Sequence, residues 1–356
     1  MRFGLMFSHQ VPPGSGLSWH QPYRDMLDCL PRAEELGYSS CFQVSHHVQR
    51  DGLCPSPLVA MAAAAAVTKT MRIGTGILLV PLYAPLKLAE DVAVLDALSN
   101  GRFTFGVAPG YVSEEFAAHD IPRPERVRRF WEAIDLMQKA WTEESFGFDG
   151  EFYRVAEDSF VNPKPIQQPH PPIWYGLSGP KSLAEAARRR GVLMPSPRHG
   201  LAEIQEHLRS YRGACADAGW LPTELPLMRE VFVAETQARA EELAAPAVTY
   251  LFRELYGAKS AQGERVLRDD RGNVVTDKAD VDFEHFKSRY IIGTPEFAYE
   301  ELKRYRDELG VTELISWMHL PGLEAGAAMK SVELFAQEVM PAFGSDGPGA
   351  ARSVSA

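Results

Sequence analysis

The chain has 356 residues, and its 47 Asp and Glu residues outnumber its 37 Lys and Arg residues, for a formal net charge of −10. Nucleic-acid and anionic-membrane partners both require clustered Lys and Arg, so this composition argues against them. At 45% hydrophobic residues, a chain of this length can bury a large core. The four cysteines form no C-x-x-C pair, which predicts free thiols and a cytoplasmic protein.

Short strand-like runs alternate with longer helical patterns along the chain. We expect strands over residues 2–8, 40–45, 72–80, 103–108, 172–175, 192–196, 225–234 and 313–318. We expect helices over residues 23–36, 57–68, 85–99, 125–142, 181–190, 201–218, 236–256, 295–309 and 324–338. About eight strand-then-helix units predict an α/β fold, in which one domain over residues 1–343 closes into a (β/α)8 TIM barrel. A doubly wound sheet is the alternative, but no G-x-G-x-x-G motif follows the first strand.

Three stretches interrupt this period. Residues 145–171 form an insertion, for which the Asp149-Gly150 turn signal predicts a β-hairpin. Residues 257–282 are polar and too long for a barrel connection, so we expect a mobile lid that lies outside the core. Residues 344–356 are rich in Gly, Ser and Ala, which predicts a disordered tail.

Active residues of barrels gather at the carboxyl ends of the strands, and the second strand ends in His46 and His47. A neutral imidazole suits proton transfer near pH 7. Successive side chains of a strand end point to opposite sides, so we expect one of the two to face the pocket. The alternative is one packed and one solvated histidine. No ligand motif such as H-E-x-x-H occurs, so we expect no metal site.

Small residues at two further strand ends suggest contacts with a ligand. Ser178 and Gly179 follow the fifth strand and open a helix, where free amides bind phosphate well. The alternative is a plain N-cap formed by Ser178. Gly74 and Gly76 lie inside an apolar strand, which indicates either close approach of a ligand to the backbone or tight packing inside the barrel.

Two alanine-rich helices predict a close-packing surface. Residues 62–66 lie on one of them, and Ala89, Ala93 and Ala97 recur on the next. Small side chains let helices approach each other closely. This surface therefore either packs against the barrel or forms the interface of a homodimer.

Several motifs in the same order resemble the bacterial luciferase-like flavin monooxygenases. The longest are residues 72–91, RIGTGILLVPLYAPLKLAED, and residues 95–107, LDALSNGRFTFGV. Shorter matches are 33–38 (AEELGY), 148–153 (FDGEFY), 163–167 (PKPIQ), 171–174 (PPIW) and 292–296 (IGTPE). The resemblance covers roughly residues 1–340. It implies a (β/α)8 barrel that binds FMN, or a deazaflavin analogue, at the carboxyl ends of its strands.

The resemblance also implies roles for particular residues. His46 matches the histidine that acts as a base near the flavin and the substrate. The implied cofactor-binding residues are Gly76 and Ile77 at a non-prolyl cis peptide under the flavin ring, Ala108 beside the ring with Tyr111 close after it, Arg126, and Ser178 and Gly179 at the phosphate. Luciferases have a phosphate-contacting arginine where this chain has Pro109, and Arg126 is the candidate substitute. The two alanine-rich helices match the dimer-forming helices of the family.

The activity implied by the resemblance is that of a flavin-dependent monooxygenase. Reduced FMN from a separate flavin reductase and dioxygen would oxygenate a small apolar organic substrate or an aldehyde. Two alternatives stay open. One is a deazaflavin-dependent oxidoreductase that transfers hydride without oxygen, and the other is a non-catalytic flavin-binding subunit. His46 and the Ala89-Glu90-Asp91 segment favour the oxygenase.

Overall fold

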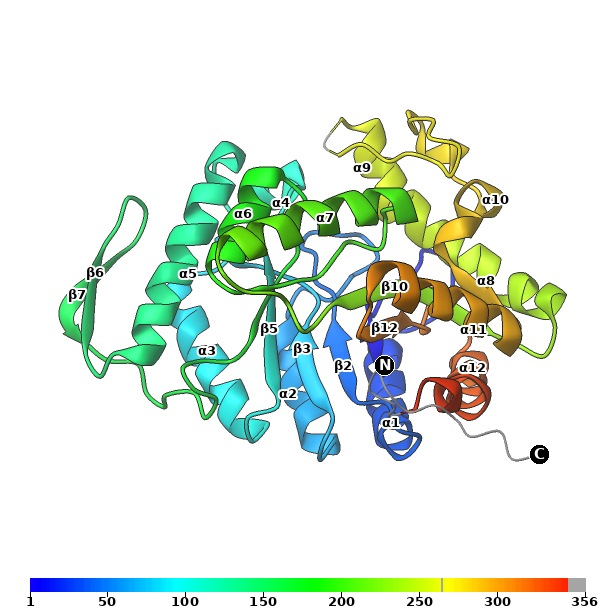
Figure 1. Cartoon of the computed structure of the whole chain (residues 1–356), viewed down its shortest axis with the longest axis horizontal. Helices are drawn as coiled ribbons and strands as arrows, with labels where there is room; N and C mark the ends of the chain where they lie inside the picture. Colours follow the sequence, from blue (N-terminus) through cyan, green and yellow to red (C-terminus); the bar gives the residue numbers. More distant parts are fainter. Residues whose placement is uncertain (264, 345–356) are drawn as a thin grey trace.

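The computed structural model describes residues 1–263 and 265–344, and the chain forms a curled parallel sheet surrounded by helices (Figure 1). The strands of this sheet are β1 (Arg2–Phe7), β2 (Ser40–Gln43), β3 (Arg72–Thr75), β4 (Leu78–Leu79), β5 (Phe103–Ala108), β8 (Ile173–Tyr175), β9 (Val192–Leu193), β10 (Pro226–Val233), β11 (Ile291–Gly293) and β12 (Glu313–Trp317). The longer helices are α1 (Gln21–Glu35), α2 (Pro57–Val67), α3 (Pro85–Leu98), α5 (Arg126–Thr142), α6 (Pro180–Arg188), α7 (Leu201–Asp217), α8 (Gln237–Leu251), α11 (Pro295–Arg304) and α12 (Ala325–Glu338). The predicted (β/α)8 TIM barrel is confirmed.

Neighbouring strands pair in parallel in the order β11-β10-β12-β1-β2-β3-β5-β8-β9. β4 pairs with β5 beyond the end of β3, so β3 and β4 share one position in the barrel. The hydrogen-bonded order ends at β9. There, buried Arg229 of β10 donates to the carbonyl oxygens of Pro197 and His199, at 3.0 Å each, in the loop after β9. This guanidinium therefore connects β10 to the loop that follows the edge strand β9.

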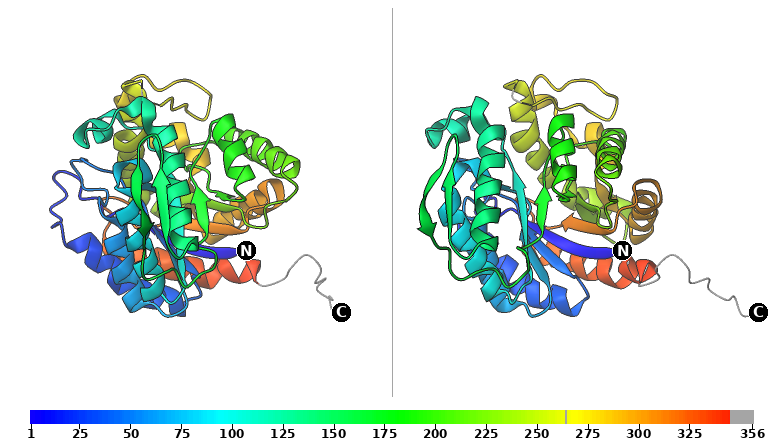
Figure 2. Two further views of the ribbon diagram at one scale, coloured as in Figure 1. Left: turned by 90° about the vertical axis from the view of Figure 1, so that its left-hand side faces the viewer. Right: turned by 60° about the vertical axis from the view of Figure 1, so that its left-hand side comes forward.

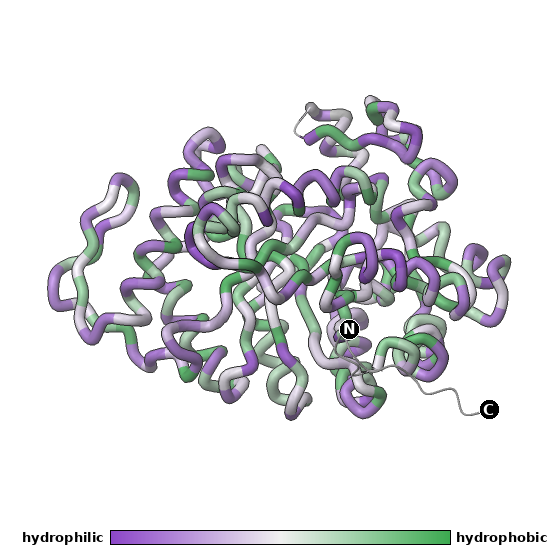
Figure 3. Tube along the Cα trace, viewed as in Figure 1, coloured by the Kyte–Doolittle hydropathy of each residue, from purple (hydrophilic) through white to green (hydrophobic). Residues whose placement is uncertain are grey.

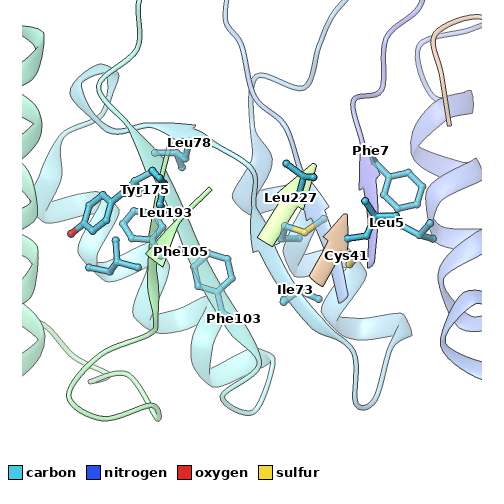
Figure 4. Close-up of a cluster of buried hydrophobic side chains, with 14 of the residues drawn as sticks. Leu5, Phe7, Cys41, Ile73, Leu78, Phe103, Phe105, Tyr175, Leu193 and Leu227 are labelled. Carbon is cyan, nitrogen blue, oxygen red and sulfur yellow. The ribbon is translucent and has the colours of Figure 1, made fainter. Parts of the chain in front are cut away.

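Two apolar layers hold the barrel together. Figure 4 shows side chains of the outer layer, such as Leu5 and Phe105, which pack with the surrounding helices. The inner layer includes Met6, Phe42 and Trp174, and the rings of Phe42 and Trp174 stack with centroids 5.0 Å apart. Leu5 and its neighbour Met6 face opposite layers, which is the period of two expected of a strand. In Figure 3 the hydrophobic colour accordingly follows the central strands.

Several elements differ from the sequence-based prediction. The strand expected over 72–80 breaks after Thr75, and the strand expected over 192–196 is only β9. The helix expected over 236–256 continues from α8 as a π-helix, Phe252–Gly257. The π-helix has only 6 residues, which is too few for the apolar spacing to distinguish it from an α-helix. β11 and the short helix α4 (Ser113–Ala118) were not predicted, because each has too few residues to establish a period.

The predicted hairpin is present as β6 (Phe146–Asp149) and β7 (Arg154–Ser159).

The predicted lid, drawn in yellow, lies over the carboxyl ends of the strands (Figures 1 and 2). The expectation that it stays outside the core is wrong, since Leu267, Val275 and Val281 are buried against the inner apolar layer. Single apolar residues in a polar stretch form no periodic signal, which is why this packing was missed. Residues 345–356 of the expected tail lie outside the described residues.

Charged side chains form ion pairs at the amino ends of the barrel strands. Buried Glu313 accepts a hydrogen bond from Ser40 and pairs with Arg2 at 3.0 Å and Arg72 at 3.4 Å.

All four cysteines are buried free thiols, as predicted. Within the described ranges no helix is long and apolar enough to cross a membrane. Over the same ranges, no group of three His, Cys, Asp or Glu residues is arranged to hold a metal ion.

Candidate active site

A cavity of about 380 Å³ lies at the carboxyl ends of the strands. Its lining includes His46 and every residue that the sequence singled out for the cofactor: Gly76, Ile77, Ala108, Tyr111, Arg126, Ser178 and Gly179. These residues end or follow four different strands or begin a helix, and they are far apart in the sequence. The structure therefore brings the whole predicted set together at one place.

His46 and His47 lie in the loop after β2, and they face different surroundings. His46 lines the cavity, and its Nδ1 lies 2.7 Å from Oε1 of Glu115 on α4. His47 does not line the cavity; its Nε2 lies 3.5 Å from the hydroxyl of Tyr83. The expectation that only one histidine faces the pocket is confirmed. The alternative with one solvated histidine is wrong, because His46 and His47 are 7% and 9% exposed.

Glu115 organises both histidines. The same Oε1 that contacts His46 accepts a hydrogen bond from the backbone amide of His47 at 2.8 Å, and the side chain is completely buried. Burial by itself raises the pKa of a carboxyl, but the His46 ring and the His47 amide outweigh it and lower the pKa of Glu115. An ionised Glu115 can only accept a hydrogen bond, so Nδ1 of His46 is the nitrogen that carries the hydrogen. The lone pair of the neutral ring is then on Nε2.

Burial also acts on the second histidine. It lowers the pKa of His47 to about 4, with His119 and His46 adding to the effect and Glu115 opposing it. His47 is therefore neutral near pH 7, and its side chain packs inside the protein.

The turn after β8 presents free backbone donors to the cavity. Gly179, not Ser178, is the N-cap residue of α6, and no side chain caps this end of the helix. The alternative of a plain N-cap formed by Ser178 is thus wrong. A Cβ placed on Gly179 would meet nothing within 4 Å, so the backbone is open there. The hydroxyl of Ser178 instead accepts a hydrogen bond from Nη2 of Arg265 at 3.1 Å. Open amides and a guanidinium are the donors that a phosphate requires.

Arginines line the same end of the cavity. Arg123, Arg126 and Arg265 are among its lining residues, and no Asp or Glu is, within the described part of the chain. Arg265 belongs to the lid segment, and its guanidinium lies 4.8 Å from the ring centroid of Tyr111. Burial, together with Arg123 and Arg265, lowers the pKa of Arg126. Positive charge therefore lines this part of the cavity from elements other than the strand end at Pro109.

Backbone without side chains forms part of the cavity wall. The Gly76–Ile77 peptide bond is cis, as the resemblance implies. A Cβ on Gly176 would lie 2.2 Å from Cδ1 of Ile77, and a Cβ on Gly76 would lie 2.6 Å from Cε of Met6. Gly176 thus lets Ile77 and Ala108 pack closely against the backbone of the cavity wall, and Gly76 does the same for Met6. Gly74 has no such role: its Cβ would meet Phe42 at 2.4 Å, which is tight packing.

Sequence reasoning missed Glu115, Arg123 and Arg265. Glu115 lies on a short helix, seven residues after the end of the fourth predicted strand. A search that continued a little further beyond each strand end would therefore have found it. Arg265 lies in the segment predicted to be a mobile lid, where no pattern distinguishes one arginine from the others.

Comparison with known proteins agrees with this geometry. The model of the luciferase-like monooxygenase family matches residues 1–313. The oxygenase component of the flavin-dependent trigonelline monooxygenase of Acinetobacter baylyi is 28% identical over 353 residues, 96% of each chain. The crystal structure of the monooxygenase RslO1 of Streptomyces bottropensis superimposes with a TM-score of 0.85 at 27% identity, over 96% of this chain and 100% of that one.

A relative with a different cofactor is also similar. The F420-dependent glucose-6-phosphate dehydrogenase of Intrasporangium calvum is 33% identical over 175 residues, which is 46% of this chain and 51% of that protein. The relatives thus include flavin-dependent monooxygenases and F420-dependent enzymes. The family model spans most of the barrel and the cavity residues described above, so the chain belongs to the luciferase-like monooxygenase family.

Proposed function

We propose that this chain is the oxygenase component of a two-component monooxygenase, which takes reduced FMN from a separate flavin reductase and oxygenates a small organic substrate or aldehyde with dioxygen. The observation that carries the proposal is the placement of His46. Its ring lines the same cavity as the uncapped start of α6 at Gly179 and the guanidinium of Arg265, so a proton-accepting group and an anion site face one space.

The residues present fit an FMN molecule. The uncapped start of α6, Ser178 and the nearby arginines suit its phosphate, and the glycine-lined wall at Gly76 leaves room for a flat ring. When bound, reduced FMN supplies the electrons that activate dioxygen. The chain itself holds the phosphate, covers the cavity with Leu255 and Tyr256 from the π-helix, and accepts or returns a proton at Nε2 of His46.

Anaerobic titration with reduced FMN tests the proposal. We expect saturable binding, followed by product formation when dioxygen and an apolar substrate are added. The second candidate is hydride transfer from reduced F420, which the similarity to an F420-dependent dehydrogenase favours. Binding of reduced F420 with no binding of FMN would replace the first proposal by the second.

Arg265→Ala is expected to weaken FMN binding. Hydrogen bonds to charged groups contribute about 1.5–3 kcal/mol, so the dissociation constant should rise by about 10- to 100-fold. Riboflavin has the same ring system but no phosphate, so its affinity should not change. Arg268→Ala is the matched control: Arg268 lies on the same segment but contacts the carbonyl of Gly272 and does not line the cavity. Equal losses for FMN and riboflavin would contradict a phosphate contact.

We also propose a homodimer that forms through α2 and α3. Ala89 and Ala93 are completely buried inside the protomer, so these two alanines pack against the barrel rather than against a partner. The exposed large apolar residues on the same helices are Val59 at 72%, Val67 at 37%, Val94 at 43% and Leu98 at 64%. They are the surface that an interface would cover.

Leu98→Glu is expected to shift the protein from dimer to monomer in multi-angle light scattering, because a charge buried at the interface would lose its water. Leu221→Glu is the control, since Leu221 is 70% exposed but follows α7. A wild-type monomer at micromolar concentration, or dissociation by both variants, would count against this interface.

A further inference from the structure

Three buried side chains with unpaired polar atoms form a row across the strands next to the cavity. Glu230 of β10 is the register partner of Trp317 on β12. β10 also pairs with β11, Val231 opposite Ile291, which places Tyr290 beside Glu230 on its other side. Register partners on parallel strands point to the same face of a sheet. Trp317, Glu230 and Tyr290 therefore form one row on the inner face.

Each member of this row has a polar atom with no partner among the described residues. These atoms are Nε1 of Trp317, both carboxylate oxygens of Glu230 and the hydroxyl of Tyr290. The exposed fractions of the three side chains are 0%, 0% and 2%. Folded proteins pair nearly all buried polar groups, and each exception needs a reason, such as a ligand. Four such atoms in one row point to a group that the row is built to bind.

The row adjoins the cavity of the active site. Trp317 lines it, as does Met228, which lies two residues before Glu230 and hence on the same face of β10. Tyr256 lines it from the π-helix, and burial together with the nearby Glu230 carboxylate raises the pKa of Tyr256. Single π-helical turns are frequent at functional sites. Glu230 thus lies directly behind residues that form the cavity wall.

The surroundings of Glu230 are mostly aromatic. The ring of Phe252 lies 4.9 Å from each of the rings of Tyr256 and Tyr290, measured between centroids. Burial raises the pKa of Glu230 to about 7, against the opposing charges of Arg229 and Arg289. Tyr256 and Tyr290 are the other titratable groups that face it, and both stay protonated near neutral pH because their pKa values are raised.

We propose that the row of Trp317, Glu230 and Tyr290 is a subsite for a positively charged group of the substrate. A buried carboxylate and aromatic faces both attract a cation, and removal from water strengthens both effects. This inference rests on the proposed function, since it assigns the substrate of that site.

N-methylpyridinium and toluene test the subsite, because they have nearly the same shape and differ in charge. Binding to the full chain is followed by calorimetry and by the fluorescence of tryptophan. At pH 8 we expect the cation to bind at least about tenfold more tightly than toluene. At pH 6 this preference should shrink, because Glu230 is protonated below its raised pKa and no longer attracts a cation. Toluene affinity should not depend on pH.

Glu230→Gln should abolish the preference for the cation and its dependence on pH. Glu242→Gln is the matched control, since it removes the same charge from an exposed side chain that pairs with Arg239. Equal affinity of the two probes for the wild-type protein would overturn the inference without the need for any variant. A preference that persists in Glu230→Gln would overturn it too. FMN titration of the same samples keeps this outcome separate from the proposed function, which fails only if FMN does not bind.

Discussion

His46→Ala is expected to reduce product formation by at least about a hundredfold, because a positioned acid or base contributes about 10²–10⁴ in rate. The ring of His46 lines the cavity, and its Nδ1 is held by Glu115 at 2.7 Å, so the reaction would lose a base that the fold has oriented in advance. The measurement is a single-turnover assay with reduced FMN and dioxygen. It follows product per enzyme, and FMN affinity is determined separately and should be unchanged.

His47→Ala is the natural comparison. His47 does not line the cavity and is neutral near pH 7, since burial lowers its pKa to about 4. Its ring packs 5.0 Å from that of His119, so its loss should lower the free energy of unfolding and leave the rate of oxygenation within a few-fold of wild type. Full activity in His46→Ala together with loss in His47→Ala would show that the wrong imidazole has been assigned.

The sequence predicted the barrel and the location of the site because both follow from strong rules. Regular alternation of strands and helices leaves few arrangements, and parallel strands bring their carboxyl ends to one side. Any residue at such an end, such as Ala108 or Ser178, must then lie near the others. For this reason, the predicted site residues converge on one cavity although they are distant in the sequence.

The missed residues depend on contacts that no short pattern encodes. Glu115 meets His46 across 69 positions, and Arg265 meets Ser178 across 87, so neither pair leaves a local signal. Glu230 was missed for another reason: a single acidic residue in an apolar strand does not reveal whether it faces water or the barrel interior. The alanines of α3 left two interpretations open in the sequence, since small residues pack equally well against the protein's own barrel or a partner.

Glu115→Gln is expected to lower the rate of oxygenation by about a hundredfold, the loss that a small misplacement of a reacting group causes. Glutamine keeps an acceptor for the His47 amide but removes the charge that orients His46 and holds its proton on Nδ1. Glu115 touches no reacting atom, so it acts by positioning. Its effect should therefore appear in kcat and in the pH profile, while the KM and the FMN affinity stay the same. Glu114→Gln, on the neighbouring exposed carboxylate, should have no such effect.

The same substitution has an expected effect on stability that depends on pH. The pKa of Glu115 is lowered in the folded chain, so its ionised form stabilises the fold above the ordinary carboxyl pKa, and this contribution is lost as the pH falls through the lowered value. Hydrogen bonds to a charged group contribute about 1.5–3 kcal/mol, so Glu115→Gln should unfold at lower urea concentration than wild type at pH 7. The difference in the free energy of unfolding should narrow as the pH drops below about 4. A constant difference between pH 7 and pH 3 would mean that Glu115 acts through its shape rather than its charge, and the orientation of His46 would then need another cause.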